Sequence, residues 1–391
     1  MKSIYLDYAS TTPIDKTVAN RMSSYLYNDN FGNPASNIHS FGLRAKEAVE
    51  RSRTKIANII GATEKEIIFT SGATESDNLA IKGVAFSNQN KNKHIITSSI
   101  EHRAIIDTCL FLKTQGFKVT FISPDNKGQI TQKKIKKAIR DDTILISLMA
   151  VNNELGTFYP ISEIGALARE KNIIFHVDAA QGVGKILIDV NTMKIDLLSI
   201  SAHKIYGPKG IGALYIRRKP KIKVTPLIHG GGHESGARSG TLATHQIIGL
   251  GDACQLMIEN REKFYRHIKQ LRSNFIEQMK KLPRIIINTP LDNSYPGIIN
   301  ITFEGIDGET LITLLDNLSV SMGSACASSS PEPSHVLIAI GLSPTQAHSS
   351  LRFSFGKDTT FKEISIASKK IINAVNKLRK LSPQWKKSFN V

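Results

Sequence analysis

The chain has 391 residues, of which 41% are hydrophobic and 21% charged, a composition typical of a folded globular protein. This length predicts two domains, or one large domain with an appendage, and it allows a large core. No run of about 18 apolar residues occurs, which excludes a transmembrane helix. The first residues lack the apolar core of a signal peptide. The sequence therefore predicts a cytoplasmic protein without a membrane partner.

Positive charge is the strongest global bias, because 51 Lys and Arg against 33 Asp and Glu give a formal net charge of +18. This charge permits nucleic acid, anionic lipid or an acidic protein as a partner and selects none of them. A surface of solvated lysines explains the same number equally well. The three cysteines, Cys109, Cys254 and Cys326, are too few for a disulfide framework, and none forms the C-x-x-C pair of a zinc site.

Over the first two thirds of the chain, short apolar runs alternate with amphipathic stretches. The runs typical of strands are 66–70, 93–99, 118–123, 143–151, 173–179, 196–201 and 212–217. The stretches with helical character are 73–86, 104–115, 131–140 and 162–171. Strands that alternate with helices predict βαβ units and an α/β fold, in which helices cover both faces of a mostly parallel mixed sheet.

The pattern changes after about residue 245. The elements predicted there are a long amphipathic helix over 245–282, strands at 284–288 and 300–303, and helices at 308–318 and 361–381. A loop rich in Ser, Gly and Pro covers about 321–335. We therefore expect a large domain over residues 15–250 and a smaller α+β domain made of residues 1–14 and 251–391.

Three segments at predicted strand ends supply the groups that one cofactor needs. In FTSGATESDN (69–78), helix N-terminal amides and a Thr hydroxyl suit a phosphate, although a simple helix cap explains this segment better when it is taken alone. Asp178 in HVDAAQ either pairs with a cation, such as a protonated ring nitrogen, or caps the next turn. Lys204 in SISAHKIYGPKG is either a surface lysine or a desolvated amine that forms a Schiff base. These three groups, a phosphate site, an acid and a lysine in this order on one parallel sheet, indicate a site for pyridoxal phosphate.

Three further residues are candidates for chemistry. His102 follows a strand and could stack on a cofactor ring and transfer protons near neutral pH. Cys326, in GSACASSSPEPS (323–334), has no apolar periodicity around it and is expected to be an exposed, reactive thiol rather than an incidental loop cysteine. The other two cysteines are expected in the core. Arg352 suits either a substrate carboxylate or a structural ion pair, and its spacing does not separate the two.

Taken together, the motifs resemble those of the pyridoxal-phosphate-dependent cysteine desulfurases of the IscS/NifS group, most closely the IscS type. The motifs are YLDYASTTP, FGNPAS, SGATESDN, EH at 101–102, VNNE-G, HVDAAQ, SAHKIYGPKG, GGGHE-G-RSGT, GSAC and HSS-RFS. The resemblance covers residue 4 to about 385. It implies the fold-type I architecture of class-V aminotransferases, a homodimer, and conversion of L-cysteine to L-alanine with a persulfide on Cys326. The sulfur would pass to acceptor proteins, among them an iron–sulfur scaffold protein, for iron–sulfur cluster assembly and tRNA thiolation.

The resemblance also implies roles for individual residues. Lys204 would bind pyridoxal 5′-phosphate, Lys204 or His102 would remove the substrate α proton, and Cys326 would be the nucleophile. His102 would also stack on the ring. Asp178 would pair with the ring nitrogen and Gln181 with the phenolic oxygen. The substrate carboxylate would bind Arg352 and Asn153, which also borders the cofactor. The residues implied for the phosphate are Ala73, Thr74, Ser201, His203 and, from the other subunit, Thr241. Cys326 could also ligate a transient [2Fe-2S] cluster shared with the scaffold protein.

Departures from the IscS type concern the partners. Ser235 stands where relatives commonly carry Arg, which removes one positive charge, and the chain ends at SPQWKKSFNV, where relatives continue with a tail that helps to dock the scaffold protein. The strength of that docking is left open. The basic run Arg217–Lys223 is predicted to receive acidic protein partners, and no direct nucleic-acid ligand is expected. The alternatives are a selenocysteine lyase or an aminotransferase of the same fold and, in another class, a basic RNA-binding protein with a vestigial site. The presence of every chemical position argues against the last.

Overall fold

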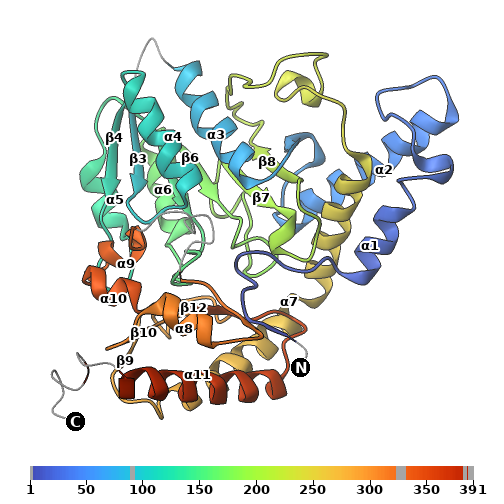
Figure 1. The fold of residues 1–391 in the computed structure, drawn as a ribbon. Helices are drawn as coiled ribbons and strands as arrows, with labels where there is room; N and C mark the ends of the chain where they lie inside the picture. Colours follow the sequence, from blue (N-terminus) through green and yellow to red (C-terminus); the bar gives the residue numbers. More distant parts are fainter. Residues whose placement is uncertain (1–2, 89–92, 323–331, 382–384, 386–391) are drawn as a thin grey trace.

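A mixed seven-stranded sheet forms the centre of the protein in the computed structural model, which describes residues 3–88, 93–322, 332–381 and 385 (Figure 1). The strand order is β2-β8-β7-β6-β5-β3-β4, in which β8 is antiparallel to its two neighbours and the other neighbouring pairs are parallel. The strands are β2 (Ile67–Thr70), β3 (His94–Ser98), β4 (Lys118–Ile122), β5 (Thr143–Met149), β6 (Ile174–Asp178), β7 (Leu197–Ser201) and β8 (Gly212–Ile216). The prediction of a mostly parallel mixed sheet is confirmed.

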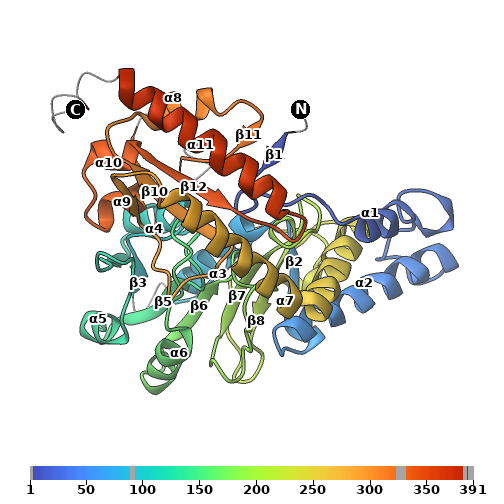
Figure 2. The ribbon, with the colours of Figure 1, turned by 90° about the horizontal axis from the view of Figure 1, so that it is seen from below.

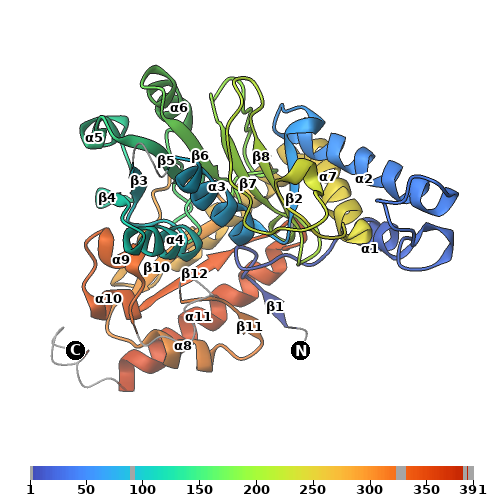
Figure 3. The same cartoon turned by 90° about the horizontal axis from the view of Figure 1, so that it is seen from above.

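Helices cover both faces of this sheet, which is why its central strands are continuously apolar. Every residue of β5 and β7 is buried, and neighbours along a strand enter different hydrophobic clusters: Leu145 packs on one face and Ile146 on the other. The helices α3 (Ala73–Ser87) and α4 (Arg103–Thr114) cover one face, and α5 (Gln132–Ala138) and α6 (Ile161–Glu170) cover the other (Figure 3).

Three helices at the β2 edge were only partly foreseen. The long helix expected over 245–282 is α7 (Thr244–Met279), whereas α1 (Lys16–Ser23) and α2 (Ser40–Ile59) had no counterpart among the predicted elements. The pair α2 and α7 packs closely because Gly251 faces Ser52, and a Cβ at Gly251 would lie 2.7 Å from the Ser52 Cβ. A larger residue at position 251 would therefore separate the two helices.

A second, antiparallel sheet lies beneath the first in Figure 1, among the orange and red elements. Its order is β12-β10-β9, formed by β9 (Ile285–Ile287), β10 (Ile298–Phe303) and β12 (Ser350–Ser354). The chain's start joins this region, because β1 (Ile4–Tyr5) pairs in parallel with β11 (Leu318–Ser319) and Asp7 bridges to Ser354. Figure 2 shows α7 and α11 (Phe361–Leu381) crossing this side of the molecule.

The remaining helices are short. They are α8 (Gly308–Leu314), α9 (His335–Ala339), α10 (Pro344–His348) and the 3-10 turns Asn28–Asn30, Glu64–Glu66, Ala202–Lys204 and Glu234–Gly236. The helix expected over 308–318 is wrong at its C-terminal end, because the chain turns at Asn317 (φ 60°) to enter β11.

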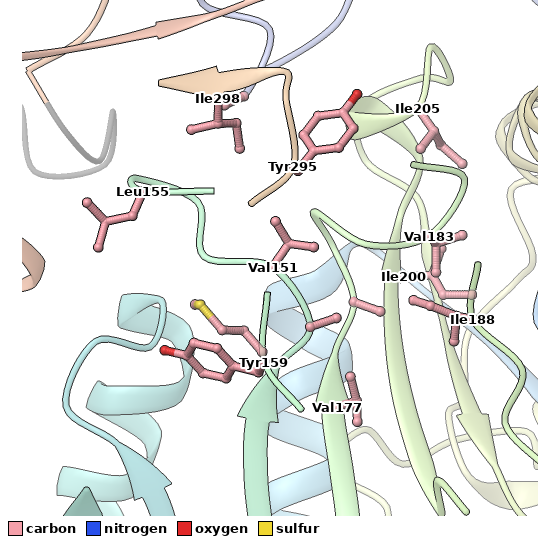
Figure 4. Packing of buried hydrophobic residues seen from close by; sticks show 14 of the residues in the cluster. Val151, Leu155, Tyr159, Val177, Val183, Ile188, Ile200, Ile205, Tyr295 and Ile298 are labelled. Carbon is pink, nitrogen blue, oxygen red and sulfur yellow. The ribbon is translucent and has the colours of Figure 1, made fainter. Parts of the chain in front are cut away.

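A continuous core joins the two sheets. Val151 and Leu155 follow β5, whereas Tyr295 and Ile298 lie at the start of β10, and all four belong to one buried cluster (Figure 4). Because apolar side chains fill this junction, the ends of the large sheet are held at a fixed position against the small one.

Candidate active site

A cavity of about 370 Å³ opens at the carboxyl ends of the parallel strands, where open α/β sheets bind ligands. Strands β5, β6 and β7 reach it with Met149, Asp178 and Ser201, and β12 of the small sheet contributes Arg352. The sequence-predicted residues that line it are Ala73, Thr74, His102, Asn153, Asp178, Gln181, Ser201, His203, Lys204 and Arg352. Residues predicted from separate motifs are therefore brought together in one site.

One end of the cavity is built to receive an anion. Helix α3 starts here after Gly72, which has no side chain to cap the first-turn amides and adopts φ 156°, a value that favours glycine. A Cβ on Gly72 would meet no atom within 4 Å, so the backbone faces open space. His203 also lines the cavity, and burial, followed by the charge of Lys204, lowers the pKa of its imidazole to about 4. The ring is therefore neutral at pH 7 and can donate or accept a hydrogen bond.

Lys204 is held by the N-terminal segment of the chain. It ends the short turn after β7, and its Nζ donates to the carbonyl oxygens of Ala9 (2.8 Å) and Ser10 (2.7 Å). The Nε2 of Gln181 donates to the same Ala9 oxygen at 2.7 Å. These two neutral carbonyl oxygens hold the Lys204 amine at the cavity wall.

Asp178 and His102 both line the cavity, and the charge of each affects the pKa of the other. The Asp178 carboxylate accepts from the Ala180 amide (2.9 Å), and burial raises its pKa against the opposing effects of that bond, His102 and Lys204. His102 caps α4 with Nδ1 as acceptor from the Ala104 amide (3.2 Å). Burial lowers the His102 pKa, with Asp178 opposing. With Nδ1 as the acceptor, the neutral ring carries its hydrogen on Nε2, so it takes up a further proton at Nδ1 only by giving up the bond to Ala104. The buried acid is suited to a cationic ring nitrogen.

Sequence reasoning missed a second buried acid at this point. Asp77 lines the cavity one helical turn after Ala73, and neither carboxyl oxygen has a hydrogen-bond partner among the described residues. Burial, followed by repulsion from Asp178, raises the Asp77 pKa well above its usual value. Its neighbour His176, 3.6 Å away, has its pKa lowered to about 3 by burial and is neutral. Helical spacing within SGATESDN was the signal that could have found Asp77.

Arg352 satisfies the structural alternative left open by the sequence. Its side chain is 2% exposed, and Nη2 donates to Asp7 Oδ1 (2.9 Å) and to Ser10 Oγ (2.7 Å). Nη1 donates to the Asn153 carbonyl oxygen at 2.9 Å. Its Nε and the side-chain oxygen of Asn153 are buried without a hydrogen-bond partner among the described residues. Arg352 therefore forms an ion pair with Asp7, while its Nε and the Asn153 side-chain oxygen stay without partners among the described residues.

Comparison with known proteins decides the family. The class-V aminotransferase family matches residues 4–366. The cysteine desulfurase IscS of Colwellia psychrerythraea is 53% identical over 383 residues, covering 98% of this chain and 95% of the relative, and the enzyme of that name from Pseudomonas aeruginosa gives the same values. The chain belongs to the cysteine desulfurases of the class-V aminotransferase family.

Solved structures of cysteine desulfurase relatives agree with this fold. A NifS-like protein superposes with a TM-score of 0.90 at 36% identity, covering 96% of this chain and 99% of its own. A structure described as SspA in complex with cysteine has a TM-score of 0.82 at 42% identity, covering 92% of this chain and all of its own. The fold-type I prediction is confirmed.

The site fits pyridoxal phosphate, the cofactor of the cysteine desulfurases. The cavity volume is that of a small-molecule site. It combines an uncapped helix N-terminus for the phosphate, a buried carboxylate for the ring nitrogen and a lysine at the wall. The unpartnered oxygen of Asn153 borders the same space. The three groups that the cofactor needs therefore share one cavity.

Other predicted residues of the desulfurase lie elsewhere. Thr241 is exposed and does not line the cavity of its own chain, and Cys326 lies outside the described residues. Cys109 and Cys254 are buried as expected, and burial raises the pKa of both thiols to about 12, so neither is a ready nucleophile. Within the described ranges, no cluster of His, Cys, Asp and Glu could hold a metal ion, and no helix is long and apolar enough to cross a membrane.

The basic run of the desulfurase is less uniform than its sequence suggests. Arg217 is largely buried, and its Nη2 lies 2.6 Å from the Asp196 carboxylate, so it belongs to the interior. The exposed cations of the run are Arg218, Lys219, Lys221 and Lys223. Any acidic partner would meet these four and not Arg217.

Proposed function

We propose that the protein is a pyridoxal-phosphate-dependent cysteine desulfurase that converts L-cysteine to L-alanine and leaves the sulfur as a persulfide on Cys326. One observation carries the proposal: Lys204, Asp178, His102 and an uncapped helix N-terminus line a single cavity in a chain that is 53% identical to cysteine desulfurases. When bound, pyridoxal phosphate supplies an electron sink for the charge that develops at the substrate Cα.

The residues of this chain would bind and orient the reactants. The α3 N-terminus, Ser201 and His203 would hold the phosphate, and Asp178 would keep the ring nitrogen protonated. Gln181 would donate a hydrogen bond to the phenolic oxygen. The unused Nε of Arg352 would donate to the substrate carboxylate, and Asn153 would donate to it through Nδ2, the nitrogen of its side-chain amide.

Proton and sulfur transfer would fall to three side chains. Lys204 or the neutral imidazole of His102 would remove the α proton of the substrate. The Cys326 thiolate would attack the substrate sulfur, the substrate C–S bond would break, and a proton delivered to Cβ would complete alanine. The balance is L-cysteine plus one enzyme thiol giving L-alanine plus one enzyme persulfide, without an external oxidant.

The experiment measures alanine and sulfide from the purified holoenzyme given L-cysteine and a thiol reductant. Equal amounts of the two products are expected. Cys326→Ala should lose sulfide release while keeping the visible absorption of the cofactor, whereas Lys204→Ala should lose that absorption. Full sulfide release by the Cys326 variant would contradict the nucleophile, and conversion of a 2-oxo acid to an amino acid would favour an aminotransferase.

We further propose a homodimer in which Thr241 reaches the phosphate of the other subunit. Exposed apolar side chains in and around the connection between α1 and α2 support such an interface, because a soluble monomer rarely exposes so many together. They are Leu26, Tyr27, Phe31, Ile38, Phe41 and Leu43, with 36% to 98% of each residue exposed. Light scattering should give twice the chain mass of 43.1 kDa, and a monomer would contradict the proposal.

The proposed recipients of the sulfur are an iron–sulfur scaffold protein and other acceptor proteins in the cytoplasm, serving iron–sulfur cluster assembly and tRNA thiolation. The exposed cations Arg218, Lys219, Lys221 and Lys223 would attract acidic acceptors. The transient [2Fe-2S] cluster at Cys326 belongs to the same proposal. Loading Cys326 with ³⁵S and adding an acceptor should move the label, and retention of the label on the enzyme would argue against that acceptor.

A further inference from the structure

Lys185 carries a buried amine that the catalytic scheme above does not use. It lies in the turn after β6, it is only 9% exposed, and its Nζ lies 5.6 Å from the centre of the Tyr295 ring. Among the described residues no Asp or Glu lies within 4 Å of Nζ, and its charged neighbours Lys204 and Arg352 are cations as well. A buried ammonium without a counter-ion costs folding free energy, so an arrangement of this kind calls for a function.

The contact that Lys185 makes is directional. Its Nζ donates to the side-chain oxygen Oε1 of Gln181. A protonated lysine offers only donors, so it requires the oxygen of the Gln181 amide to face it. The amide nitrogen Nε2 must then face the other way, where it donates to the Ala9 carbonyl oxygen at 2.7 Å. Gln181 also lines the main cavity, and its Nε2 carries a second hydrogen that the Ala9 contact does not use.

Lys185 also stands directly behind the lysine of the site. A small cavity of about 20 Å³ is lined by both Lys185 and Lys204, and its other titratable lining groups are Tyr8, Tyr206 and Tyr295. Burial, followed by the charges of Lys204 and Arg352, lowers the Lys185 pKa to about 7. The Lys185 amine can donate to Gln181 in either protonation state. Only the cation, which has no lone pair, prevents the Gln181 amide from turning its nitrogen toward Lys185.

We propose that Lys185 is a positioning residue that fixes Gln181 as a hydrogen-bond donor toward the phenolic oxygen of the bound cofactor. This rests on the proposed function, because it takes pyridoxal phosphate as the ligand of the main cavity. Without Lys185 only the Ala9 carbonyl oxygen still fixes the Gln181 amide, so the amide loses one of the two contacts that keep its nitrogen available to the oxyanion. The oxyanion form of the cofactor is then less stable, and its protonated form persists to higher pH.

The test is a spectroscopic pH titration of the visible absorption of the holoenzyme, carried out without substrate. Lys185→Met should raise the apparent pKa of that absorption by about 1 to 2 pH units, the size of a lost hydrogen bond to a charged group. Lys185→Arg keeps a permanent donor and should restore the parent value. Lys113→Met, at an exposed lysine, is the matched control and should change nothing.

A double-mutant cycle separates action through Gln181 from action of the charge alone. Gln181→Leu should itself raise the apparent pKa, and adding Lys185→Met to it should cause no further shift. An unchanged titration of the single Lys185→Met variant, or fully additive shifts in the double variant, would overturn the proposal. Lys185→Met should remain folded, because an apolar side chain replaces an unpaired buried charge. A parent protein that binds no cofactor would instead refute the proposed function.

Discussion

Glu234 holds the loop that follows β8 against the large sheet, and its carboxylate is the most informative group to neutralise. It accepts from both terminal nitrogens of Arg53 (2.8 and 2.9 Å) and from the Phe69 amide (2.8 Å), and the side chains of Glu234 and Arg53 are 3% and 10% exposed. Arg53 also stacks on the Phe69 ring. Phe69 lies in β2, three residues before the Gly72 that begins the anion site.

The expected cost of Glu234→Gln follows from this burial. Removing one partner of a buried ion pair costs about 3 to 5 kcal/mol when the other charge stays in place. The loop is also under backbone strain, because Glu234 and Ser235 adopt φ values of 49° and 55°. Strain of this type is worth about 1 to 2 kcal/mol per residue, but it is present in the parent and in the variant, so it cancels from the difference between them. Because Arg53 keeps its contacts with Glu50 and with the Ile67 carbonyl oxygen, and glutamine keeps one acceptor oxygen, the loss should be below that range, at about 2 kcal/mol. It should appear as local opening of the loop.

Hydrogen–deuterium exchange on the holoenzyme measures this opening directly. Peptides covering residues 226–243 should exchange about 30-fold faster in Glu234→Gln, the factor that 2 kcal/mol gives. The matched control is Glu47→Gln, whose partner Arg51 lies one helical turn away on the exposed face of α2 and whose loss should cost less than about 1 kcal/mol. Equal exchange in the Glu234 variant and the parent would refute the assignment of this ion pair as the anchor of the loop.

Three further outcomes are expected. Arg352→Lys should lower kcat/KM for L-cysteine about 10- to 100-fold, mainly through KM, because an ammonium lacks the Nε–H that the guanidinium keeps free for the substrate; an unchanged KM would assign Arg352 to structure alone. Because burial lowers the pKa of His102, the imidazole stays neutral below its ordinary pKa of about 6.5. The acid limb of the kcat profile should therefore lie below pH 6.5 and vanish in His102→Gln; a limb above pH 7 would contradict this. Replacing both Arg218 and Lys221 by Glu should weaken the binding of an acidic acceptor at low salt and reduce the salt dependence of that binding. Replacing the exposed Lys136 by Glu should change neither. Equal effects of the two changes would reject the basic run as the binding surface.

Residues at the ends of parallel strands were predictable, because such strands place their carboxyl ends at one edge. Asp178 and Lys204 follow apolar runs, so their meeting in one cavity could be expected before any coordinates. Gly72 was equally visible as the start of a helix after a strand. The division of the chain at residues 14/15 and 250/251 stays a prediction.

Contacts between distant segments were not predictable from one sequence. Asp7 and Arg352 are 345 residues apart, and the acceptors of Lys204 are backbone carbonyl groups, which carry no residue signature. Lys185 follows the apolar turn residues of GVGK and looks like any surface lysine. Arg217 was read as part of a surface patch, whereas its side chain returns to the buried Asp196. In each case the partner is set by tertiary packing, which local patterns do not encode.

The involvement of both chain ends in the site has a consequence for the time at which the protein becomes functional. The carbonyl groups of Ala9 and Ser10 position Lys204, but the segment that carries them is itself fastened by Arg352 and by pairing with β11. A ribosome must release most of the chain before those fastenings can form. The protein should therefore bind its cofactor only late in synthesis. A nascent chain arrested before residue 350 should lack the visible absorption of the bound cofactor.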